Sequence, residues 1–228
     1  MRALPNIVSA ITADGLAVLM HQPPTATLST LLGAAYESWL NKRAKDAHGI
    51  LIAEISKGNR FSNDIEPDLF FGLLHRYLNA TKQVVARRNL RLMAQVLAGS
   101  LEQDCPFQPD KLASMAELVA SLTKDEIKFL AVFWSCHVES AQSPLTTIDP
   151  EITGPQRVLV STHTLALQRL VPNIFALESE FFALSGSLSR TGLLITKTVN
   201  DGVRVEVTHR LADLVKLCDI EGISVNEL

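Results

Sequence analysis

Hydrophobic residues recur at three- and four-residue spacing through most of the first 140 positions of the chain. The spacing is clear between Leu28 and Leu40, within a stretch that runs from Thr27 to Lys57. It returns near Pro67 and continues, with a bend near residues 79–81, as far as Gly99. Because apolar residues at this spacing share one face of an α-helix, the pattern predicts long amphipathic helices.

Residues 123–126, Thr-Lys-Asp-Glu, predict the start of another helix. A threonine followed three residues later by glutamate matches the capping box, in which each side chain bonds to the other residue's backbone. This helix follows a shorter one that carries Leu112, Met115 and Leu118. No apolar periodicity continues between residues 141 and 155, where prolines and polar residues predict a linker.

The C-terminal part predicts two further helices, over residues 156–170 and 173–189, and then a β-hairpin. Residues 193–199 and 203–207 are rich in β-branched residues and flank Asn200-Asp201-Gly202, a turn sequence. A last helix is expected at 209–218. The predicted fold is mostly α: an N-terminal helical bundle over residues 1–140, the linker, and a C-terminal unit over residues 156–228.

The C-terminal unit resembles a winged helix. The resemblance covers residues 156–218 and rests on Gly192-Leu193-Leu194-Ile195, the hairpin, and Val207-Thr208-His209-Arg210-Leu211. Helical prophage and defence-associated bacterial proteins of the abortive-infection alpha type end similarly. The resemblance implies a winged-helix-like unit in a regulator of bacterial or phage origin.

Charge is unevenly distributed over the 228 residues, whose net charge is −3. Residues 1–100 contain 11 Lys and Arg against 7 Asp and Glu, whereas residues 101–228 contain 10 against 17. The three cysteines, Cys105, Cys136 and Cys218, form no CxxC pair, which favours reduced thiols. No signal peptide or membrane-spanning stretch is expected, so we expect a cytoplasmic protein.

Two groups of cations are candidates for contact with nucleic acid. Arg87, Arg88 and Arg91 lie in a stretch without acidic residues between Asp68 and Glu102, and the predicted wing offers Lys197 and Arg204. The alternative interpretation is a solvated face, or arginines paired with acids elsewhere in the fold. The candidate recognition helix, residues 174–184, carries two glutamates and no cation, which argues against DNA reading.

Catalytic and metal signatures are weak. Cys136 and His137 are adjacent in sequence, and neighbours on a helix do not face each other. The six histidines show no HxxxH or HExxH spacing. No catalytic residue, cofactor or metal is therefore assigned. The leading hypothesis is a non-enzymatic regulatory protein that acts through protein contacts and forms a possible homodimer. The alternative is a nucleic-acid-binding regulator that uses the basic helix and the wing.

Overall fold

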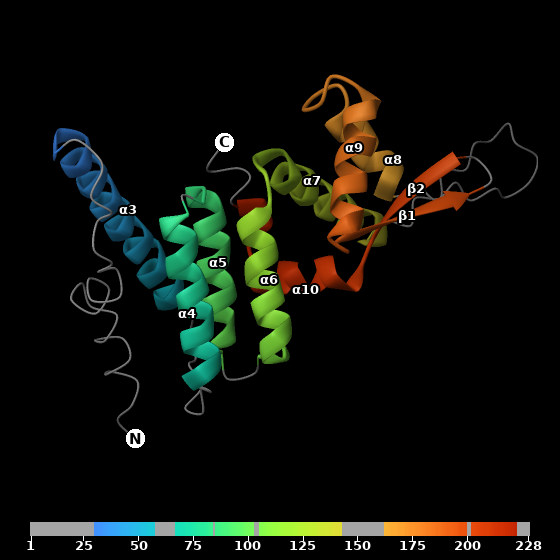
Figure 1. Cartoon of the computed structure of the whole chain (residues 1–228). Helices are drawn as coiled ribbons and strands as arrows, with labels where there is room; N and C mark the ends of the chain where they lie inside the picture. The colour runs from blue at the N-terminus through green and yellow to red at the C-terminus, as the bar shows by residue number, and fades with distance from the viewer. Residues whose placement is uncertain are drawn as a thin grey trace, which may run out of the picture. The chain divides into compact units, whose positions relative to one another are not determined.

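Helices dominate the structure, as the spacing of apolar residues predicted (Figure 1). The computed structural model describes residues 30–57, 67–83, 85–102, 105–142, 162–199 and 202–222. The chain divides into two compact units, Met1–Ala120 and Ser121–Leu228.

The first unit is built from α3 (Thr30–Lys57), α4 (Pro67–Lys82), α5 (Arg87–Ser100) and α6 (Pro109–Ser121). Helix α5 packs against both α3 and α4. The buried side chains come from all four helices and are mostly aliphatic, including Leu51, Leu73, Leu92, Leu97, Leu112 and Val119. A core of this composition suits helices, since leucine and alanine lose little side-chain freedom there.

Buried hydrogen bonds fix the helices of this unit against one another. The Tyr77 hydroxyl on α4 donates to the carbonyl of Ala47 on α3 at 2.7 Å. The Asn89 amide on α5 donates to the carbonyl of Val119, near the end of α6, at 2.7 Å. Because buried polar groups cost free energy when unpaired, these bonds restrict how the helices can pack.

Helices α4 and α5 are separate, whereas the sequence predicted one helix with a bend near residues 79–81. Helix α4 ends at Lys82, and α5 begins at Arg87. Arg43 of α3 stabilises the break, since its guanidinium donates to the carbonyls of Thr81, at 2.8 Å, and Val85. Carbonyls that would otherwise lack a partner at a helix end are thus satisfied from another helix.

The second unit contains α7 (Lys124–Gln142), α8 (Thr162–Leu170), α9 (Glu178–Arg190), β1 (Leu194–Val199), β2 (Gly202–Val207) and α10 (His209–Leu217). The predicted hairpin is confirmed, because β1 and β2 pair antiparallel with Leu194 opposite Val207 and Thr198 opposite Val203. The turn residues Asn200 and Asp201 lie outside the described residues.

The capping box at Thr123 is also confirmed. The Glu126 amide donates to the Thr123 hydroxyl at 3.2 Å, and the Glu126 carboxylate accepts from the Thr123 amide at 2.8 Å. Further along α7, Phe129 stacks on Phe133 with ring centroids 5.5 Å apart. The ring centroid of Phe129 also lies 5.0 Å from that of Phe181 on α9. The aromatic cluster joins α7 to α9 in one core.

Thr208 joins the hairpin to the last helix. Its hydroxyl accepts from the Leu211 amide at 3.3 Å, as an N-cap residue does, and donates to the Gly192 carbonyl at 2.8 Å. Gly192 has a φ of +75°, a conformation that glycine adopts without strain and that often follows a helix end. Helix α9 ends at Arg190, close to the predicted helix end at residue 189.

Helix α9 begins later than predicted. The sequence predicted a helix over 173–189, but residues 171–177 form turns, and α9 starts at Glu178. The amides of Ile174 and Phe175 both bond to the carbonyl of Leu170, which closes the end of α8 instead of opening α9. Phe175 is buried and anchors this turn in the unit.

The two compact units divide at Ala120 and Ser121, before the start of α7, whereas the predicted bundle extended to residue 140. The difference arises because the aromatic face of α7 packs with α8 and α9. Helix α7 runs to Gln142, and the rest of the predicted linker lies outside the described residues. Within the described ranges, no helix combines the length and apolarity required to cross a membrane.

Candidate functional site

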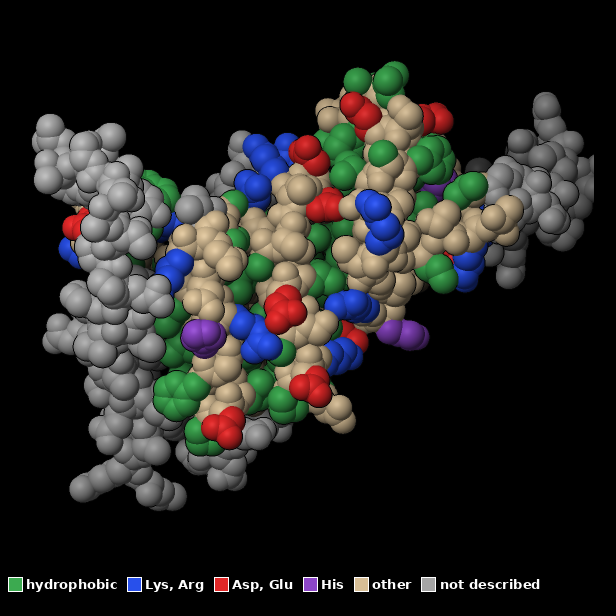
Figure 2. All heavy atoms as spheres, viewed as in Figure 1, with side chains coloured by type: hydrophobic (Ala, Val, Ile, Leu, Met, Phe, Trp, Pro, Cys, Tyr) green, Lys and Arg blue, Asp and Glu red, His purple; other side chains and the backbone are tan. Residues whose placement is uncertain are grey.

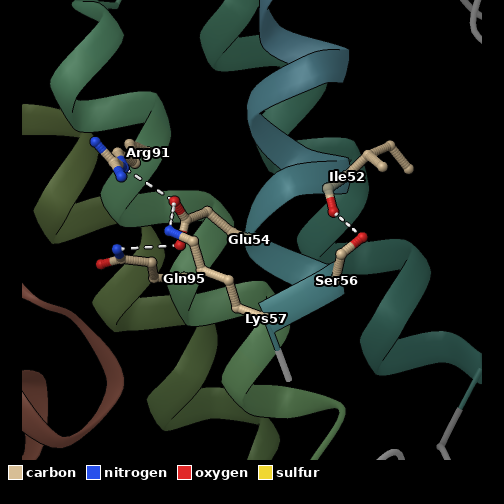
Figure 3. Close-up of polar contacts among 6 residues, drawn as sticks. All are labelled: Ile52, Glu54, Ser56, Lys57, Arg91 and Gln95. Carbon is tan, nitrogen blue, oxygen red and sulfur yellow. Dashed lines mark hydrogen bonds and ion pairs between the residues drawn. The ribbon is translucent and has the colours of Figure 1, made fainter. Parts of the chain in front are cut away.

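Arg91 is held by an ion pair inside the first unit (Figure 3). Its Nε lies 2.9 Å from Oε1 of Glu54 on α3, whose side chain is only 5% exposed. Lys57, at 2.7 Å, and the Gln95 amide, at 3.3 Å, donate to the same carboxylate. Burial alone would raise the pKa of Glu54, but the hydrogen bonds from Lys57, Arg91 and Gln95 outweigh it and lower the pKa below its ordinary 4.5.

The other two arginines of the predicted basic group differ in exposure. Arg87, the first residue of α5, is exposed. Arg88 is half-buried, and its buried Nε has no hydrogen-bond partner among the described residues. Arg76, which belongs to the same acid-free stretch, pairs with Glu117 of α6 at 3.0 Å. Part of the basic stretch therefore compensates carboxylates within the fold. Of the three arginines predicted to contact nucleic acid, Arg87 is the most exposed.

Lys197 and Arg204 lie opposite each other in the hairpin. Lys197 pairs across the strands with Glu206, whereas Arg204 is exposed and has no ion pair with another described residue. Of the five predicted contacts, Arg87, Arg88 and Arg91 belong to the first unit, and Lys197 and Arg204 to the second.

Three large apolar side chains are exposed where α8 turns into α9. Leu177 is 62% exposed, Ile174 41% and Phe182 38%. Glu178, the first residue of α9, is exposed beside them, and so is Glu180. We call Ile174, Leu177, Glu178 and Phe182 the α8–α9 corner. Figure 2 shows hydrophobic side chains and carboxylates gathered at this uppermost end of α9. The helical spacing of residues 174–184 does not reveal that Leu177 is exposed.

His163 of α8 lies behind the corner. Its ring contacts Phe181 and Phe182, with centroids 5.4 and 6.1 Å away, and its Nδ1 accepts from the Val205 amide of β2 at 3.4 Å. Burial, and then the positive charge of Arg204, lower the pKa of His163 below its ordinary 6.5. The neutral ring thus links α8, α9 and the hairpin.

Cys136 lacks the surroundings of a reactive thiol. Its side chain is fully buried, and burial raises the pKa of the thiol, whereas nucleophilic cysteines have a lowered pKa and access to substrate. Among the described residues, no group of three or more His, Cys, Asp or Glu side chains is placed to bind a metal ion.

Comparison with known proteins leaves the family open: no family model matched the chain, and neither did any curated protein or solved structure.

Proposed function

We propose that the chain is a non-enzymatic regulatory protein that acts through protein contacts of its Ser121–Leu228 unit. The helix that precedes the hairpin carries the argument. In a winged helix that reads DNA, this helix presents cations and amides to the major groove. Here, α9 begins with exposed Glu178 and Glu180 and exposes Leu177 and Phe182 beside them.

Electrostatics support protein contact over DNA contact for α9. Phosphate contacts by lysine and arginine supply most of the non-specific affinity for DNA, and carboxylates at the same place repel the backbone. Apolar side chains with charged neighbours are instead typical of surfaces that bind proteins. The order of α7, α8, α9 and the hairpin supports the likeness to winged-helix units, some of which make protein contacts. A bacterial or phage origin is part of the same proposal, from the likeness to abortive-infection alpha-type proteins.

One observation favours the alternative, a nucleic-acid-binding regulator. Arg87 and Arg204 are both exposed, and neither has an ion pair with another described residue. Exposed arginines of this kind contact phosphates in many complexes. The two functions therefore predict opposite results in one titration.

The test is fluorescence anisotropy with a mixed-sequence DNA duplex at low and at physiological salt. We expect the wild-type protein to show no salt-dependent binding. Micromolar binding that weakens steeply with salt, and that is lost in Arg87→Glu or Arg204→Glu, would establish the alternative function. Both substitutions lie at exposed positions and leave Arg91, which holds Glu54, in place.

A further inference from the structure

Leu177 occupies a helix position where leucine is unfavourable. It is the N-cap of α9, with an extended backbone at φ −130° and ψ 147°. Ser, Thr, Asp and Asn are preferred there because their side chains accept a hydrogen bond from the first turn, which leucine cannot do. The Glu180 carboxylate instead reaches back to the amides of Ala176, at 2.8 Å, and Leu177, at 3.3 Å. The sequence therefore keeps an exposed leucine where a capping residue would stabilise the helix.

A second observation is the charge around this leucine. Between residues 170 and 189, the chain contains two glutamates and no lysine or arginine. The preceding cation, Arg169, pairs with Glu139 of α7. Glu178 of the corner consequently has no cation nearby in sequence, and the exposed apolar side chains share their surface with negative charge.

This charge pattern discriminates between possible occupants of the corner. In a twofold contact between two copies, the same surface meets itself. The Glu178 carboxylates of both copies would then lie in one interface to which residues 170–189 contribute no lysine or arginine, and uncompensated like charges in an interface are costly. A nucleic-acid backbone is excluded from the corner for the same reason. A partner that carries lysine or arginine beside apolar side chains matches both properties of the surface.

We propose that the α8–α9 corner docks a basic amphipathic segment of a partner protein. An apolar side chain of the partner packs against Leu177 and Phe182, and a neighbouring lysine or arginine approaches Glu178. This inference rests on the proposed function and specifies the chemistry of its partner.

Two fluorescein-labelled peptides test the proposal. Both carry leucines at helical i, i+3, i+4 and i+7 spacing; the remaining positions are lysine in one peptide and glutamate in the other. We expect the lysine peptide to bind the full-length wild-type protein, with an affinity that falls as salt rises. The glutamate peptide should bind at least about tenfold more weakly. Equal binding of the two peptides, or no binding of the lysine peptide to wild type, overturns the proposal.

Leu177→Ser separates docking from folding. Serine restores an N-cap acceptor, so the melting temperature should rise or stay unchanged, while affinity for the lysine peptide should fall about tenfold or more. Phe71→Ser is the matched control, because Phe71 is 56% exposed on α4 in the other unit. The affinity of the Phe71→Ser variant for the lysine peptide should equal that of wild type. Unchanged affinity in Leu177→Ser contradicts the assignment.

Glu178→Gln tests the charge separately. The substitution removes the negative charge but keeps a similar shape, so binding should weaken and the salt dependence should become shallower. A salt dependence equal to that of wild type would contradict a role for Glu178. The duplex titration distinguishes the two levels of failure: loss of peptide binding refutes only this inference, whereas duplex binding refutes the proposed function.

Discussion

Glu54 and Glu126 are both buried carboxylates, and the two units compensate them differently. In the first unit, the cations Arg91 and Lys57 lie within 3 Å of Glu54. In the second unit, the Glu126 carboxylate accepts from the Thr123 amide and hydroxyl and, at 2.6 Å, from the Ser187 hydroxyl of α9. One carboxylate is thus compensated by opposite charge, and the other by neutral hydrogen-bond donors.

The difference shows why a run of cations is a weak indication of function. Arg91 looks available in the sequence because no acid lies near it, yet Glu54 reaches it from a helix 37 positions away along the chain. In the second unit, two hydroxyls and a backbone amide perform most of this task for Glu126, and the positive charge of Arg190 adds a smaller contribution, so the charge pattern shows little of the compensation. The charge pattern of either unit can therefore be interpreted only after its buried carboxylates are known.

The largest effect is expected from removing the cation that holds Glu54. Arg91→Met should lower the free energy of unfolding by about 2 kcal/mol, because a buried carboxylate loses a strong donor while Lys57 remains. Urea denaturation measures the change. Arg87→Met, at an exposed position of the same helix, is the control and should stay within about 0.5 kcal/mol of wild type. Equal effects of the two substitutions would contradict the importance of the ion pair.

A smaller loss is expected from the neutral donor in the second unit. Ser187→Ala removes one hydrogen bond to Glu126 and should cost about 1 kcal/mol in urea denaturation. Ser179→Ala, at an exposed position of the same helix, should change the stability by less than about 0.5 kcal/mol. If Ser187→Ala behaved like this control, the Glu126 carboxylate would not depend on the hydroxyl.

Acid should diminish the contribution of Ser187. Burial alone would raise the pKa of Glu126, but hydrogen bonds from Ser187 and Thr123 outweigh it and lower the pKa below its ordinary 4.5. Because the folded-state pKa is lowered, this stabilisation is full above pH 4.5 and is lost as pH falls through the folded-state value. The difference in the free energy of unfolding between wild type and Ser187→Ala should therefore become smaller below pH 4.5. The decrease should be less than about 1 kcal/mol. A constant difference between pH 7 and pH 3 would refute this linkage.

The smallest effect concerns His163. Its folded-state pKa lies below 6.5, so the stability that the neutral ring confers is present above pH 6.5 and is lost as pH falls through the lower, folded-state value. Protonation also removes the acceptor for the Val205 amide. Hydrogen exchange of this amide, corrected for intrinsic rates, should accelerate in wild type on mild acidification. In His163→Phe, the corrected exchange rate should not respond to the same change in pH.

The sequence predicted most elements because their signals are local. The capping box fixed the start of α7 through residues three positions apart, and the alternation around Asn200-Asp201-Gly202 indicated the hairpin. The break between α4 and α5 was placed only approximately, since the guanidinium that stabilises it belongs to Arg43, 38 positions before Thr81. The start of α9 was placed too early because the apolar residues before Glu178 continue a helical spacing, although they form a turn.

The candidate site was less predictable than the fold. The acidic character of α9 was visible in the sequence, whereas the exposure of Leu177 follows from the turn that precedes the helix. A signal was nevertheless present: Glu178 and Glu180 suit the first turn of a helix and indicate a start near Glu178, although none of the preferred N-cap residues stands directly before it. The engagement of Arg91 by Glu54 required the packing of α3 on α5 and had no local signal.

Thr208 has a consequence for the kinetics of the second unit. One hydroxyl both closes the chain segment back to Gly192 and holds the first turn of α10. Separation of the strands at their base strains the bond to Gly192, and fraying of α10 from its start breaks the bond from Leu211. Because both bonds use the same side chain, opening of the hairpin and of the first turn of α10 should be partly coupled.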